Sequence, residues 1–192
     1  MLSAVLSAKD LVWVLSLSLF VAIGACSSRA PASLVPAPQQ FPVTATIQDL
    51  MQGQIDPSAD ALWDAVAIIE SPTGTEDRHP RTNAEWRAVR THAITLIEAT
   101  NLLSMPGRRI KDGDAPAGQG ELPPAEIQRR IAVSHDSFVR FARLLQVAGR
   151  RALTAIDARD VQGLMDAGGL IDQACEACHL TYWYPDQKRP PT

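Results

Sequence analysis

Beyond residue 43, apolar residues recur every three or four positions, the spacing that places them on one face of a helix. No convincing run of alternating apolar and polar residues predicts a strand. The pattern predicts four helices, over about residues 44–70, 82–105 and 124–156, and from 161 to a few residues beyond His179. Because the loops between them are short or modest, we expect an all-α fold, an antiparallel up-down-up-down four-helix bundle.

Local signals mark the first two helices. Thr82 and Glu85 form the sequence pattern of a capping box at the start of the second helix. Asp56 and Pro57 interrupt the first helix, where Asp56 suits an N-cap and Pro57 suits the first turn. The apolar stripe keeps its phase across this break, and Gly53 relieves crowding by the proline ring. We therefore expect one kinked helix rather than two separate helices.

The first 25 residues have the pattern of an export signal. Residues 11–25 are nearly all apolar, but they are fewer than the roughly 20 that a membrane-spanning helix needs. A short apolar core that ends in small residues is typical of a secretory signal. The segment ends in Ile23-Gly24-Ala25-Cys26, which resembles a bacterial lipoprotein signal, where the cysteine becomes the lipidated first residue. We therefore expect export to the periplasm or cell envelope, with a lipid at Cys26 that anchors the protein to a membrane. An ordinary signal peptide and an uncleaved anchor are the alternatives.

Residues 26–43 are rich in proline and predict an extended tether, because they contain little to bury. At about 3.1 Å per residue, the tether would reach at most roughly 50 Å. That length would hold a folded domain away from a membrane surface. The folded domain is expected over residues 44–184, followed by a short tail at 185–192.

Charge and cysteine count narrow the classes of function. The chain has 192 residues and a formal net charge of −3, without the basic excess of a nucleic-acid-binding protein. Its three cysteines are an odd number, which excludes a disulfide framework that pairs all of them. No general base, nucleophile or phosphate-binding loop is evident in the sequence, so we expect no enzyme in the usual sense.

The fourth predicted helix carries the candidate chemistry. Residues 175–179 are Cys-Glu-Ala-Cys-His, the C-x-x-C-H attachment pattern for c-type haem. Two thiols three positions apart share a helical face and can form thioethers with two haem vinyl groups, and the adjacent imidazole can reach the iron. A thioredoxin-like motif would need a βαβ setting, and a structural zinc site would need four ligands. A Cys175–Cys178 disulfide in a non-haem envelope lipoprotein would leave His179 without a role.

A C-x-x-C-H motif near the end of the last helix of an exported four-helix protein resembles the class II c-type cytochromes, the cytochrome c-prime family. The resemblance covers about residues 44–184, and residues 160–182 match best. It implies one haem c bound covalently by Cys175 and Cys178, with His179 as the proximal ligand of the iron.

The same resemblance implies a functional role. It implies one-electron transfer with a redox partner protein, or binding of a gas such as NO or CO at a five-coordinate iron. Tyr182 matches an aromatic residue that family members often place three positions after the histidine, whereas Trp183 stands where the family often has a basic residue. Family members are often dimers through their first two helices, so a homodimer is one option.

The distances of residues from the end of the predicted bundle select a candidate for the sixth ligand of the iron, on the side opposite His179. In an up-down-up-down bundle, the end of the fourth helix lies beside the start of the first. At about 1.5 Å per residue, His179 lies about 6 Å and Met51 about 10 Å from that end, whereas His92 and His135 lie roughly 16–18 Å from it. Low-spin members of the resembled family use a methionine on the first helix. We therefore expect Met51 to be the sixth ligand; the alternative is that it packs over an open iron face.

Two further features lie outside the motif. Arg108, Arg109 and Lys111 fall in the loop at the proposed haem end, where they could pair with a haem propionate, steer a partner or simply be solvated. Gly168 and Gly169 each cost about 1 kcal/mol of helix stability relative to alanine. Their position in mid-helix predicts close approach by another helix.

Overall fold

Helices account for most of the residues that the computed structural model describes, which are 41–113, 115 and 120–187. The expectation of a mainly helical chain is therefore confirmed. The predicted export signal, the lipid site at Cys26, most of the tether and the end of the tail lie outside the described residues. Within those ranges, no helix combines the length and the apolar character that crossing a membrane requires.

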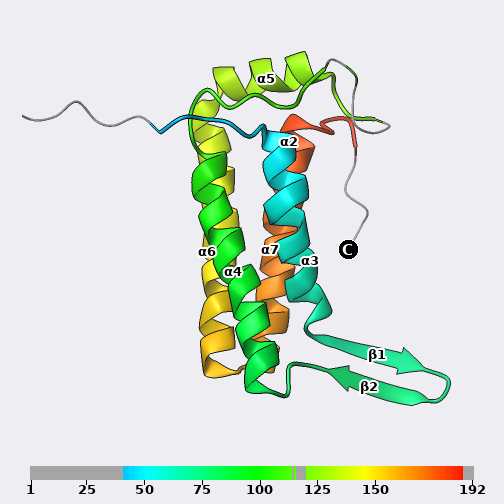
Figure 1. Cartoon of the computed structure of the whole chain (residues 1–192). Helices are drawn as coiled ribbons and strands as arrows, with labels where there is room; N and C mark the ends of the chain where they lie inside the picture. The colour runs from blue at the N-terminus through cyan, green and yellow to red at the C-terminus, as the bar shows by residue number, and fades with distance from the viewer. Residues whose placement is uncertain (1–40, 114, 116–119, 188–192) are drawn as a thin grey trace, which may run out of the picture. The chain divides into compact units, whose positions relative to one another are not determined.

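Helical segments far apart in the sequence pack side by side (Figure 1). The first consists of α2 (Ile47–Leu50), a π-helical turn η1 (Met51–Ile55) and α3 (Asp56–Asp64). The others are α4 (Asn83–Leu103), α5 (Pro124–Val133), α6 (His135–Ala158) and α7 (Val161–Tyr182). Helix α3 contacts α4 and α7, and α6 contacts the same two helices, so the four enclose a shared apolar core. Helix α5 lies across one end of these helices, near α2.

The first helical segment continues through Pro57 rather than dividing in two, as the sequence predicts, but Asp56 has helical backbone angles (φ −59°, ψ −51°) and is not an N-cap. The turn before the proline is π-helical, and the Asp56 N–H donates to the carbonyl of Met51, five residues back. This wider turn gives room to the proline ring, which cannot donate a hydrogen bond and crowds the preceding turn of an α-helix. At the start of the segment, the Asp49 N–H donates to Thr46 Oγ1 (3.1 Å), and the Thr46 N–H donates to Asp49 Oδ2 (2.8 Å).

The first helix is shorter than predicted, and the expectation of an all-α chain without strands is wrong here. Residues beyond Ala65 form an antiparallel hairpin of β1 (Ala67–Ser71) and β2 (Gly74–Arg78). Gly74 at the turn has φ of 136°, a conformation that favours glycine. Ile69 continues the helical apolar spacing but pairs with Glu76 in the hairpin and is 36% exposed. The β-branched pair Ile68-Ile69 therefore follows strand preference rather than the helical stripe.

The second and third predicted helices have different outcomes. The capping box of α4 is confirmed, since the Glu85 N–H donates to Thr82 Oγ1 (3.2 Å) and the Thr82 N–H donates to Glu85 Oε2 (2.8 Å). The single helix predicted over 124–156 is wrong, because Ser134 separates α5 from α6 with φ of −129° and ψ of 42°. The carbonyl of Ser134 accepts the N–H of Phe138 (3.1 Å), which begins α6.

Candidate functional site

Helix α7 is fixed at its start by a side-chain cap. Asp160 Oδ1 accepts the backbone N–H of Gly163 (2.9 Å), which satisfies one of the free donors of the first turn. A Cβ atom at position 163 would lie 2.4 Å from Asp160 Oδ2, so a larger residue there would make the Asp160 side chain shift. The cap sets where α7 begins and hence where its last turns fall.

The other end of α7 is fixed by a buried aromatic residue. The Tyr182 ring packs edge-on against Phe138 (5.6 Å between centroids) and Phe141 (6.0 Å) of α6. Its hydroxyl lies 3.2 Å from Ser134 Oγ and donates to the carbonyl of Ser134 (3.3 Å). Tyr182 thus ties the end of α7 to the junction between α5 and α6.

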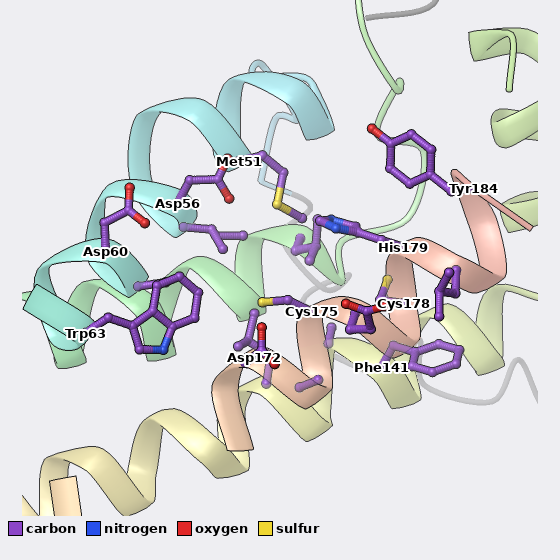
Figure 2. A pocket seen from close by; sticks show the side chains of 18 of the residues that line it. Met51, Asp56, Asp60, Trp63, Phe141, Asp172, Cys175, Cys178, His179 and Tyr184 are labelled. Atoms are coloured by element: carbon purple, nitrogen blue, oxygen red, sulfur yellow. The ribbon is translucent and has the colours of Figure 1, made fainter. Parts of the chain in front are cut away.

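Between these two anchors, the residues of the C-x-x-C-H motif line one cavity of about 360 Å³ (Figure 2). Cys175, Cys178 and His179 are three and four positions apart, which places them on one helical face. The cavity lies within the size range of small-molecule and cofactor sites. Its apolar lining comes from several helices and includes Ile55, Ala59, Leu103, Phe141, Ala142 and Leu145.

Both thiols at the cavity are free and held in the protonated form. Burial, with added repulsion from the charges of Asp56 and Asp172, raises the pKa of Cys175 to about 11. Burial and the nearby Cys175 raise the pKa of Cys178 to about 12. A redox-active or nucleophilic cysteine has a lowered pKa instead. The pair therefore lacks the electrostatics of a thioredoxin-like centre.

The imidazole of His179 is kept neutral and held by aromatic neighbours. Burial lowers the pKa of His179, and this effect exceeds the opposing charges of Asp56, Glu176 and Glu121. The rings of Trp183 and Tyr184 lie edge-on to the imidazole, with centroids 5.8 and 6.4 Å away. A neutral imidazole in a fixed orientation is the form that binds a metal ion.

Met51 lies across the cavity from the motif, at the first residue of the π-helical turn. Figure 2 shows its sulfur directed toward His179, with the two residues on facing helical segments. Both residues also line a second hollow of about 230 Å³ that includes Gln48, Gln52 and Lys111. His92 and His135, which the sequence places farther from this end, are not among the residues that line the cavity with His179.

The sequence interpretation missed three residues at the site. Trp63, Phe141 and Tyr184 line the cavity, from α3, from α6 and from the segment after α7. A signal existed for Tyr184, because both tyrosines and one of the four tryptophans of the chain fall within residues 182–184. For Trp63 and Phe141, helical spacing shows which face of its own helix each residue occupies. It does not show that this face contacts α7.

Arg108 does not have the role considered for it from the sequence. It is only 6% exposed, and its guanidinium donates to the carbonyl of Leu102 (3.0 Å) and to that of Ala45. Arg109 pairs with Asp112 at the surface. A loop arginine committed to two backbone carbonyls is a structural link, and it is not available to a propionate or a partner.

The residues at the cavity fit a haem c. They provide two protonated thiols on one helical face, a neutral imidazole beside them and an apolar wall from three other helices. A methionine sulfur, the second kind of axial ligand found in c-type cytochromes, faces the imidazole.

Comparisons with known proteins give one distant likeness. No protein-family description matches the chain, and no curated protein does. A similar solved structure is the nitric oxide complex of a mutant cytochrome c prime from Alcaligenes xylosoxidans. It is 18% identical over a match that covers 76% of this chain and 99% of that one, with a TM-score of 0.41. Because identity and TM-score are both low, the proposal below is built on this chain's own residues.

Proposed function

We propose that this chain is a mono-haem c-type cytochrome that transfers single electrons at the cell envelope. One observation carries the proposal: Cys175, Cys178, His179 and Met51 line the same cavity. We further propose that the four long helical segments form an antiparallel four-helix bundle with the haem at the end occupied by α5. The pairwise packing of α3, α4, α6 and α7 supports this arrangement.

Each residue at the cavity has a distinct task in this proposal. The thiols of Cys175 and Cys178 would hold the cofactor on α7 through thioether links. His179 would bind the iron, while the rings of Trp183 and Tyr184 hold the imidazole in place. When bound, haem c supplies one-electron chemistry at its iron.

Met51 decides which reaction the site favours. If Met51 bound the iron together with His179, its thioether would raise the reduction potential, which suits electron transfer. The orientation of Met51 toward His179 supports this role. Apolar side chains such as Leu103, Phe141 and Leu145 would lower the dielectric constant on part of the surroundings of the iron, although carboxylates including Asp56 and Asp172 also line the cavity.

The cellular setting is part of the proposal. The apolar segment 11–25 and Cys26 indicate export and a lipid anchor, and the tether would let the domain reach a redox partner protein near the membrane. The composition favours neither a nucleic-acid partner nor an enzyme active site of the usual kind.

One observation favours a second function, binding of a diatomic gas at a five-coordinate iron. Met51 also borders the neighbouring hollow with Gln48 and Gln52. A side chain turned into that hollow would leave Ile55 and Ala59, with the carboxylate of Asp56, on this side of the cavity. An open iron face then suits gas binding rather than electron transfer.

Absorption spectra of the purified oxidised and reduced protein test the two functions. Low-spin bands in both oxidation states, converted to high-spin bands by Met51→Ala, would support electron transfer with Met51 bound. High-spin bands in the parent protein would support gas binding. Met105→Ala is the matched control, since Met105 contacts Arg108 in the loop and does not line the cavity. A purified protein without haem would overturn both functions.

A further inference from the structure

Trp63 separates the cavity from an outer hollow on the surface. The outer hollow measures about 400 Å³ and lies over α7, where Met165, Gly168 and Gly169 line it. Trp63 and Asp172 line both this hollow and the cavity that holds the C-x-x-C-H residues. Figure 2 shows both side chains on the side of the cavity where Cys175 lies. Trp63 is 36% exposed, so this part of the wall is in contact with solvent.

The Trp63 indole packs against the backbone of α7 at Gly168, which has no side chain. Trp63 Nε1 donates to the carbonyl of Gly168 (3.0 Å), the one hydrogen bond that the indole can donate. A Cβ atom at Gly168 would lie 3.1 Å from Cδ1 of Trp63 and 3.4 Å from its Nε1. The close approach expected from the two glycines is therefore made at Gly168. A Cβ atom at Gly169 would meet nothing within 4 Å, so there is open space beside the contact between the indole and Gly168.

From this geometry we propose that Trp63 is a movable wall that sets how fast small neutral molecules enter the cavity beside Cys175. The inference rests on the proposed function, because the entering molecule would bind the iron. Rotation of the indole into the outer hollow breaks one hydrogen bond and leaves the core packing of α3 intact. Leu62 and Ala59, which are buried, hold the α3 backbone while the ring moves.

Carbon monoxide is the probe that tests this role. The measurement is the rate of CO rebinding to the reduced protein after a light flash, in the Met51→Ala background so that the sulfur does not compete. Trp63→Phe keeps an aromatic wall but removes the N–H donor. Losing one neutral hydrogen bond shifts the opening equilibrium, and we expect rebinding about fivefold faster. Trp63→Ala also removes the wall itself, so its rate should exceed that of Trp63→Phe.

The two adjacent glycines provide a matched pair of variants. Gly168→Ala should displace the indole toward the outer hollow and speed rebinding in the same direction as Trp63→Phe. Gly169→Ala adds the same methyl group one residue away, where it meets nothing, and should leave the rate unchanged. Equal rates for the parent, Trp63→Phe and Gly168→Ala would overturn the inference, even if Trp63→Ala failed to fold.

The same samples separate this inference from the proposed function. Covalent haem in every variant, with unchanged CO rates, would overturn the movable wall and leave the cytochrome proposal standing. A parent protein without haem would overturn both. Faster rebinding in Gly169→Ala as well as in Gly168→Ala would show that any methyl group on this turn loosens the cavity, which would also overturn the specific role of Trp63.

Discussion

Replacing Arg108 should destabilise the protein more than any other single change in the loop between α4 and α5. Its guanidinium links the carbonyls of Leu102, at the end of α4, and Ala45, just before α2. Burial lowers the pKa of Arg108, as expected for a cation removed from water. The neighbouring backbone adds to this link, since the Ile47 N–H donates to the carbonyl of Arg109 (2.8 Å). The loop therefore holds the turn that precedes Met51.

The size of the effect follows from the hydrogen bonds that would be lost. Arg108→Met keeps the aliphatic packing but leaves the carbonyls of Leu102 and Ala45 without their charged donor. Each hydrogen bond to a charged group contributes about 1.5–3 kcal/mol, so for two such bonds we expect a loss of about 3–6 kcal/mol in the free energy of unfolding. Urea unfolding of the purified full-length protein, followed by helical circular dichroism, measures this quantity.

A neighbouring arginine is the matched control for this prediction. Arg109 is exposed and pairs only with the exposed Asp112, so Arg109→Met should change stability by less than about 1 kcal/mol. If Arg108→Met were as stable as Arg109→Met, the assignment of Arg108 as a structural link would be refuted. The spectrum of Arg108→Met should also show weakened Met51 binding, because the start of α2 would no longer be held.

Three other changes test separate parts of the account. Tyr182→Phe removes the hydroxyl that bonds the junction between α5 and α6, and should lower the unfolding free energy by about 1 kcal/mol, measured in urea. Hydrogen bonds from Arg129 and Arg130 hold the pKa of Glu126 at about 2, below its ordinary value of 4.5. This carboxylate stabilises the fold above about pH 4.5 and loses that effect as pH falls toward 2; Glu126→Gln should flatten the melting temperature over this range. Cys26→Ser should release the protein from membranes, and its retention in the membrane fraction would contradict a lipid anchor.

Helix starts could be predicted from the sequence where the signal is local. The capping box of Thr82 and Glu85 involves residues three positions apart, and it forms as the pattern indicates. The hairpin after α3 could not be predicted in the same way. Ile69 has the spacing of a helical apolar stripe, so the sequence pattern does not show that the helix ends before it. Only the structure shows that no neighbouring element buries Ile69. The break at Ser134 is similar, because Ile127 and Ile131 are both buried and the apolar pattern runs on without a gap.

The residues of the candidate site also differ in whether the sequence could predict them. Cys175, Cys178 and His179 are adjacent on one helix, so the motif alone places them together. Met51 could be selected because helix heights depend only on residue counts and on the order of the helices. Trp63 could not be found, since its contact is with a bare backbone at Gly168, 105 residues away in the sequence. The burial of Arg108 likewise depends on the position of α2, which a loop sequence does not encode.

The attachment of haem to α7 is the central claim, and peptide mass spectrometry of the denatured, protease-digested protein tests it most directly. The account predicts that the peptide containing residues 175–179 carries the mass of one haem, retained after unfolding because both thioethers are covalent. Changing either Cys175 or Cys178 to serine should leave at most one thioether, and changing both should leave none. A peptide with two unmodified thiols, or with a disulfide between them, would contradict the account.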